Sequence, residues 1–167
     1  RTALVMRGLG VQVPWSAPQL AITKNRRYST LEINFLAVGL AALAGIIIGA
    51  VWFGPKTFFP LWWRFLGRNP AEQPGTDNMA LIFGSTFVAA VVQSIVMSVF
   101  INLAEQATGS MDTVTGLAIG ALLGVGFAAS ASLSHHLFGG FAIKAWVLEA
   151  GQDIVSLAAM GAIIASF

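Results

Sequence analysis

Four ionisable side chains lie near one another in the C-terminal part of the sequence: His135, His136, Glu149 and Asp153. Imidazoles and carboxylates bind protons and metal ions, and inside a membrane they form proton relays. Glu149 and Asp153 are four residues apart, which places them on one face of a helix. These four residues form a candidate polar cluster.

Three interpretations of the polar cluster are open. It is a proton or ion site of a transporter, a metal site, or a structural cluster that pairs its own charges at one end of a helix bundle. The metal site is disfavoured because neighbouring side chains such as His135 and His136 point ~100° apart on a helix. We expect the structural cluster, with no metal and no cofactor.

No catalytic motif accompanies the cluster. The glycines lie in apolar runs at helix-packing spacing and do not form a phosphate-binding loop. No Ser/His/Asp spacing is recognisable, and the absence of cysteine excludes a thiol nucleophile and disulfides. We therefore predict no catalytic residue and no enzyme activity.

The elements that position the cluster are predicted to be membrane spans. Hydrophobic residues make up 56% of the 167 residues and charged residues only 10%, against ~25% charged residues in soluble domains. The charges separate four uncharged stretches, at 33–55, 78–104, 113–143 and 154–167. A spanning helix needs ~17–25 residues, which the fourth stretch reaches only if its helix begins near Trp146. The net charge of +2 is too small to indicate a nucleic-acid partner.

The sequence thus predicts an all-α integral membrane protein with four transmembrane helices in residues 32–167. The predicted spans are Ile33–Phe53, Met79–Leu103, Thr115–His135 and Trp146–Phe167. In this topology the third span ends, and the fourth begins, on the same side as the loop after the first span. Asp153, ~10 Å into the fourth span, should pair there with His135, or else with His136, Lys144, Arg64 or Arg68.

Aromatic and basic residues follow the first span directly. They predict interfacial positions, because Trp gathers where membrane and water meet. The loop is either a short amphipathic segment in the interface or a loop packed on the helix ends of its own bundle. The predicted interfacial residues are Trp52, Trp62, Trp63, Arg64, Arg68 and Trp146.

Small residues recur at every fourth position in two spans. Such stripes allow helix backbones to approach closely in lipid. Their partner is another helix of this bundle, a second copy or a foreign subunit. The glycines concerned are Gly45 and Gly49 in the first span and Gly116, Gly120 and Gly124 in the third.

Residues 1–31 form a separate, basic N-terminal extension. They hold five basic residues, Arg1, Arg7, Lys24, Arg26 and Arg27, and no acidic residue. This composition resembles an organelle-import presequence, most often mitochondrial, and Arg26-Arg27-Tyr28-Ser29 resembles a processing site. We expect the extension to lie along neighbouring subunits.

Two motifs carry a resemblance to a known family. Trp52-Phe53-Gly54-Pro55, which an aromatic run follows, and Gly151-Gln152-Asp153-Ile154-Val155-Ser156-Leu157-Ala158-Ala159-Met160-Gly161 resemble the first-span and last-helix motifs of domain of unknown function 1761. The resemblance covers roughly 33–167 and implies a bundle of four membrane helices. It implies no activity and no functional residues.

The sequence favours a non-catalytic accessory subunit of a larger organellar membrane complex, with the lipid bilayer and other membrane subunits as partners. The mitochondrial inner membrane is the expected location, with a thylakoid or a bacterial plasma membrane as alternatives. The alternative function is a small homo-oligomeric transporter or channel. A transporter should carry an ionisable group near mid-membrane, and the first three predicted spans carry none.

Overall fold

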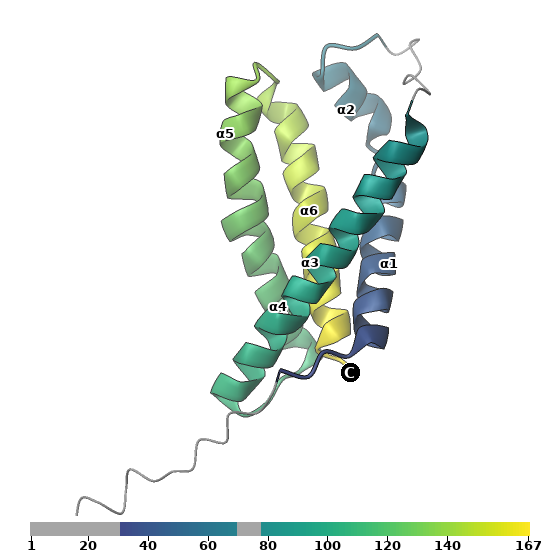
Figure 1. Ribbon diagram of the computed structural model, residues 1–167. Coiled ribbons are helices and arrows are strands. Elements are labelled where there is room, and N and C mark those ends of the chain that lie inside the picture. Colours follow the sequence, from purple (N-terminus) through teal and green to yellow (C-terminus); the bar gives the residue numbers. More distant parts are fainter. Residues whose placement is uncertain (1–30, 70–77) are drawn as a thin grey trace, which may run out of the picture. The chain divides into compact units, whose positions relative to one another are not determined.

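The computed structural model describes residues 31–69 and 78–167, in which every regular element is a helix (Figure 1). Four helices are long and apolar enough to cross a membrane. They are α1 (Phe35–Trp52), α3 (Met79–Thr108), α6 (Ile143–Ile164) and the continuous helix Thr113–Phe138. The last comprises α4 (Thr113–Leu123), the π-helix η2 (Gly124–Ala129) and α5 (Ser130–Phe138), and a short helix, α2 (Phe59–Phe65), follows α1. The prediction of an all-α integral membrane protein with four transmembrane helices is confirmed, while the predicted extension at 1–31 lies outside the described residues except for Leu31.

Most of the apolar surface of the spans faces outward. Only 22% to 33% of the residues in an apolar 18-residue window of each span are buried within the chain. Phe35, Leu81 and Phe127 are among the many large apolar side chains left exposed. Water would penalise such a surface by about 25 cal/mol per Å², whereas hydrocarbon is as apolar as the side chains themselves. The bilayer therefore covers what the chain leaves open.

Side-chain caps determine where two of the spans begin. Asn34 Oδ1 accepts hydrogen bonds from the amides of Leu36 (3.1 Å) and Ala37 (3.2 Å) at the start of α1. Asp112 Oδ1 accepts one from the Thr115 amide (2.7 Å) at the start of α4. These bonds satisfy amide donors that have no partner in the first turn of a helix. The hydrogen bond from the Thr115 amide also lowers the pKa of the Asp112 carboxyl.

α3 continues beyond its predicted end. We ended the span at Leu103, just before the charge of Glu105, but the helix runs to Thr108. It stops at Gly109, whose φ of 84° is a left-handed conformation that glycine adopts readily. A charge marks the edge of the hydrocarbon and not the end of the helix, because a helix can extend into the polar layer.

α6 is the central helix, because it packs against α1, α2, α3, α4, η2 and α5 (Figure 1). Gly116, Gly120 and Gly124 are buried against it. A Cβ atom at Gly120 would overlap the carbonyl oxygen of Leu157 and lie 2.9 Å from Ala158 Cα. The glycine stripe of the third span therefore has its partner inside the bundle.

The glycines of the first span face α6 as well. A Cβ atom at Gly45 would overlap the end of the Met160 side chain, and one at Gly49 would lie 3.4 Å from Gln152 Nε2. These neighbours are flexible side chains, whereas the glycines of α4 meet backbone. The contact between α1 and α6 is therefore the more tolerant of the two.

Buried hydroxyl groups line the interface between α3 and α6. Ser94 and Ser98 on α3 and Ser156 on α6 are all buried. Ser94 Oγ donates to the Ala90 carbonyl at 2.9 Å and lies 3.7 Å from Met160 Sδ. Ser156 Oγ accepts from Gln152 Nε2 at 2.9 Å. Such small residues let membrane helices approach closely.

Candidate functional site

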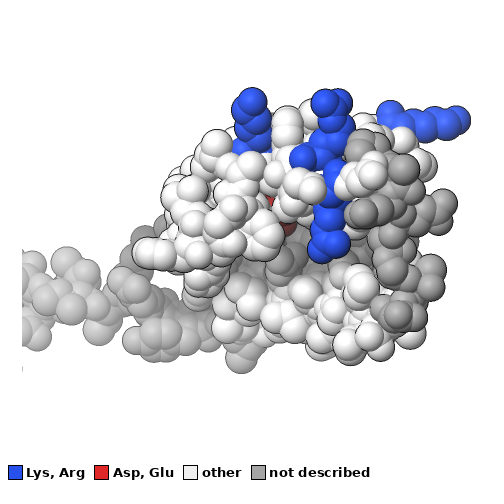
Figure 2. Space-filling model, turned by 90° about the horizontal axis from the view of Figure 1, so that it is seen from above, with Lys and Arg blue, Asp and Glu red and all other residues white. Residues whose placement is uncertain are grey.

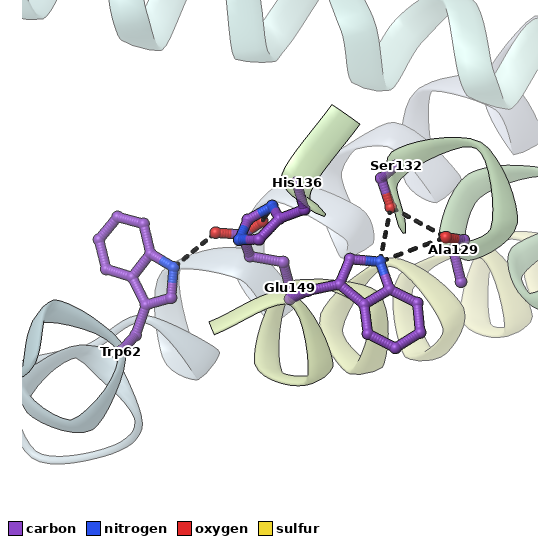
Figure 3. Close-up of polar contacts among 6 residues, drawn as sticks. Trp62, Ala129, Ser132, His136 and Glu149 are labelled. Carbon is purple, nitrogen blue, oxygen red and sulfur yellow. Dashed lines mark hydrogen bonds and ion pairs between the residues drawn. The ribbon is translucent and has the colours of Figure 1, made fainter. Parts of the chain in front are cut away.

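Glu149 on α6 is the centre of the polar contacts at one end of the bundle (Figure 3). Its Oε1 accepts a hydrogen bond from Trp62 Nε1 on α2 at 2.7 Å, and its Oε2 lies 3.3 Å from His136 Nδ1 on α5. The exposed fraction of the side chain is 30% for Glu149 and 11% for His136. One carboxylate thus joins three helices, and we call Trp62, His136 and Glu149 the Glu149 cluster.

α2 reaches Glu149 because the chain turns back directly after α1. Thr57 Oγ1 lies within hydrogen-bonding distance of the carbonyl oxygens of Val51 (2.5 Å) and Trp52 (2.8 Å) in the last turn of α1. The same two oxygens accept from the amides of Gly54 and Phe58. The Trp62 ring then packs on Phe53, with the two ring centroids 5.3 Å apart. In the structure the aromatic loop packs on the helix ends of its own bundle.

His136 has one nitrogen bound and one without a partner. Nδ1 faces the Glu149 carboxylate, whereas Nε2 is buried and has no hydrogen-bond partner in the part of the chain that the structure describes. Because an ionised carboxylate only accepts, we assign the ring hydrogen to Nδ1, which leaves Nε2 as a bare acceptor. An imidazole placed in this way can take up a proton or accept one hydrogen bond at Nε2.

The predicted pairing of Asp153 with His135 is wrong. Among residues 31–69 and 78–167, the ion pair joins His136 to Glu149, Asp153 forms none, and His135 is exposed. The reason is that α6 begins at Ile143, three residues earlier than predicted. This start brings Glu149 to His136 and places Asp153 one turn deeper, ~15 Å along the helix.

The sequence did contain a signal for the earlier start. The paired glycines Gly139 and Gly140 end the third span, and Gly140 has a φ of 74°. An apolar helix can resume directly after such a break. We placed the start near Trp146, where the fourth stretch reaches span length. The helix also includes Lys144, because a lysine in the first turn keeps its head group in the polar layer.

Trp146 ties the start of α6 to the π-helix, which the sequence did not predict. Within η2 the backbone hydrogen bonds widen from i+4 to i+5. Trp146 Nε1 lies 3.3 Å from the carbonyl oxygen of Ala129, the last residue of η2, and 3.1 Å from Ser132 Oγ (Figure 3). The Trp146 indole thus contacts the third span at the point where the backbone changes from π-helix to α-helix.

The other tryptophans predicted as interfacial also donate to acceptors within the chain. Trp52 Nε1 donates to the Leu148 carbonyl at 3.1 Å, which joins α1 to α6. Trp63 Nε1 donates to the Asn69 carbonyl at 3.1 Å. The Trp52 indole thus positions α1 relative to α6, whereas the Trp63 indole ties α2 to the loop that follows it.

A metal site would need several ligands to converge. Within the described residues, no group of three or more His, Cys, Asp and Glu side chains is placed to hold a metal ion. The two histidines diverge, because His135 is exposed while His136 faces Glu149. The chemistry that the Glu149 cluster can perform by itself is to hold or accept a proton.

Comparisons with known proteins identify the family. Residues 36–165 match the family described as "Protein of unknown function (DUF1761)". No curated protein and no solved structure matches the chain. The match reaches into all four spans and includes both motifs that carried the resemblance. The chain therefore belongs to the DUF1761 family of proteins of unknown function.

Proposed function

We propose that the protein is a non-catalytic accessory subunit of a larger membrane complex, and that it binds its neighbours through α3. One observation carries the proposal. Gln93, counted from Met79, is the fifteenth of the thirty residues of α3, and its side chain is exposed. A polar amide thus faces outward at the middle of a membrane span.

An amide in this position favours a protein neighbour over lipid. Gln93 forms no side-chain hydrogen bond with the residues that the structure describes. Transfer of an unpaired amide from water to hydrocarbon costs about 4–8 kcal/mol. A neighbouring helix that offers a donor or acceptor removes part of this cost, and glutamines form such bonds between membrane helices.

The surface around Gln93 allows a helix to approach. Residues 79–89, at the N-terminal end of α3, are all exposed. Gly84, Ser85 and Ala89 line a groove on this face together with Gln93. Small residues at the surface bring a second helix close enough to reach the amide.

The location of the complex is proposed from the sequence alone. The five basic residues and the absence of acid in 1–31 are typical of a mitochondrial presequence. We therefore propose the mitochondrial inner membrane, with a thylakoid or a bacterial plasma membrane as alternatives. Residues 1–30 lie outside the described residues. The proposal that the extension lies along neighbouring subunits therefore rests on its basic, acid-free composition.

Gln93→Leu should weaken the binding of partner subunits and leave the fold intact. Leucine cannot hydrogen-bond, and it suits lipid better than glutamine, so the melting temperature in detergent should not fall. We expect recovery of partner subunits on a tagged chain, purified from its native membrane in mild detergent, to drop about threefold to tenfold.

Val96→Leu is the matched control, because Val96 is an exposed residue of α3 that does not line the groove and has no polar group to lose. This variant should recover partners as the wild type does. Equal recovery by the Gln93 and Val96 variants would contradict the role of the amide. Purification of a discrete homo-oligomer in place of a mixed complex would contradict the accessory subunit itself.

Asp153 favours a second candidate function, a small homo-oligomeric transporter or channel. Asp153 is the eleventh of the 22 residues of α6, counted from Ile143, and it is half-buried. The earlier start of α6 moves it from a third of the way into the span to the middle. An ionisable group at that depth is costly and is typical of a proton or ion pathway.

Asp153→Asn distinguishes the two candidates. Asparagine keeps the shape of the side chain but carries no charge and binds no proton. If the protein conducts protons or cations, proteoliposomes with the wild type should show a flux under an imposed potential, and Asp153→Asn should reduce it to that of empty vesicles. The flux is measured with a pH-sensitive or cation-sensitive dye trapped in the vesicles. Glu105→Gln is the control: it lies outside the bundle core and should conduct like the wild type. A wild type that conducts no more than empty vesicles rejects the transporter.

A further inference from the structure

Three basic side chains gather around α2 from two separate elements. Arg64 belongs to the last turn of α2, Arg68 follows it closely, and Lys144 is in the first turn of α6. Two of them lie over aromatic rings of α2. The Arg68 guanidinium is 5.4 Å from the centroid of the Trp63 ring, and Lys144 Nζ is 5.8 Å from that of Phe65. We call Arg64, Arg68 and Lys144 the basic rim.

Among residues 31–69 and 78–167, no carboxylate forms an ion pair with the basic rim. Glu149, the first acidic residue of α6, has both carboxylate oxygens engaged, one by Trp62 and the other by His136. In the part of the chain that the structure describes, no lysine or arginine forms an ion pair with a carboxylate. Figure 2 shows Lys and Arg side chains projecting from this end of the molecule, and the acidic atoms of the described residues that are visible lie in the recess between them.

The depth of the basic rim is that of the lipid head groups. Lys144 lies at the very start of a membrane span, and α2 carries four aromatic residues, Phe59, Trp62, Trp63 and Phe65. Aromatic rings settle at the boundary between head groups and acyl chains, and arginines beside them reach the phosphates. The hydrogen bond from Trp62 to Glu149 holds α2 against the bundle at this level.

We propose that Arg64, Arg68 and Lys144 bind the phosphate of an anionic phospholipid head group. Guanidinium groups match phosphate oxygens with paired N–H donors, and the ammonium group adds a point charge. The contacts of Arg68 and Lys144 with the rings limit the freedom of both side chains before the lipid arrives. The Glu149 carboxylate faces Trp62 and His136 and pairs with none of the three cations, so a lipid phosphate would supply a counter-charge to the rim. This binding site is independent of the proposed accessory role.

The test uses the purified full chain in a non-ionic detergent. Native mass spectrometry counts the lipids retained when equal amounts of phosphatidylglycerol and phosphatidylcholine are added. We expect the wild type to retain phosphatidylglycerol preferentially. Each cation near a membrane surface contributes about fivefold to binding, so the double variant Arg64→Gln/Lys144→Gln should lose about thirtyfold. The melting temperature without lipid should remain that of the wild type.

Lys56→Gln is the matched control, because Lys56 is an exposed cation in the turn between α1 and α2 and is not part of the basic rim. It should retain the preference for phosphatidylglycerol. Equal retention of both lipids by the wild type, or an unchanged preference in the double variant, overturns the proposal. Binding of added inorganic phosphate in place of phosphatidylglycerol overturns it in favour of a soluble ligand. Displacement of the lipid by a co-purifying acidic protein overturns it in favour of a protein partner.

Discussion

Replacing Gly120 by leucine should prevent the native bundle from forming. A Cβ atom at this position overlaps the Leu157 carbonyl oxygen, which is backbone and cannot rotate away. Overpacking against side chains that can adjust costs about 1–3 kcal/mol. Here the third span and α6 must separate along their shared face, so we expect a loss comparable with the ~5–15 kcal/mol that stabilises a whole domain.

Gly126→Leu is the control for this experiment, six residues further along the same span. A Cβ atom there meets no atom within 4 Å, so the leucine should point into lipid and leave the bundle unchanged. Size-exclusion chromatography in detergent should show a sharp wild-type peak for Gly126→Leu and aggregated or absent protein for Gly120→Leu. Two variants that elute and melt alike would contradict the close contact between Gly120 and α6.

Much of the fold follows from features that depend on composition and coarse spacing. Uncharged stretches locate membrane spans because a charge at the centre of a span costs about 2.5–3.5 kcal/mol. The spacing of Gly116, Gly120 and Gly124 marks a helix face because four residues complete about one turn. Both inferences tolerate errors of a few residues at the helix ends, such as the five-residue error at the end of α3 (Leu103 against Thr108).

The prediction of polar contacts is much more sensitive to errors in the helix ends. Each residue turns a side chain by ~100° and moves it 1.5 Å along the axis. The three-residue error in the start of α6 was therefore enough to choose Asp153 where the structure has Glu149, and His135 where it has His136. The sequence does place the cluster at one end of the bundle, but selecting the paired atoms requires the register of two helices.

Trp62 illustrates a further limit. A tryptophan beside a membrane span is typical of the interface, and its indole N–H is satisfied there by water or lipid. Only the turn after α1, held by Thr57, directs this indole to Glu149. The π-helix is likewise invisible to periodicity, because it shifts the pattern of the third span by a single residue.

Glu149→Leu should release α2 from the bundle. The substitution removes the acceptor of Trp62 Nε1 and of His136 Nδ1, so two partly buried donors lose their partners. A hydrogen bond to a charged group contributes about 1.5–3 kcal/mol. Part of this loss is offset because a partly buried charge is removed, so we expect a net destabilisation of about 2–3 kcal/mol.

Hydrogen exchange measured by mass spectrometry distinguishes release of α2 from general unfolding. In Glu149→Leu the amides of α2 should exchange faster, while those of the third span keep their protection.

In Glu149→Gln the exchange rate of the α2 amides should lie between those of Glu149→Leu and the wild type. The amide oxygen of glutamine still accepts from Trp62, while the negative charge opposite His136 is lost. Glu105→Leu, which replaces an exposed glutamate at the far end of α3, should exchange like the wild type. If α2 remains protected without Glu149, then the packing of Trp62 on Phe53 and Phe59 holds it, and the carboxylate is free for a role in proton binding.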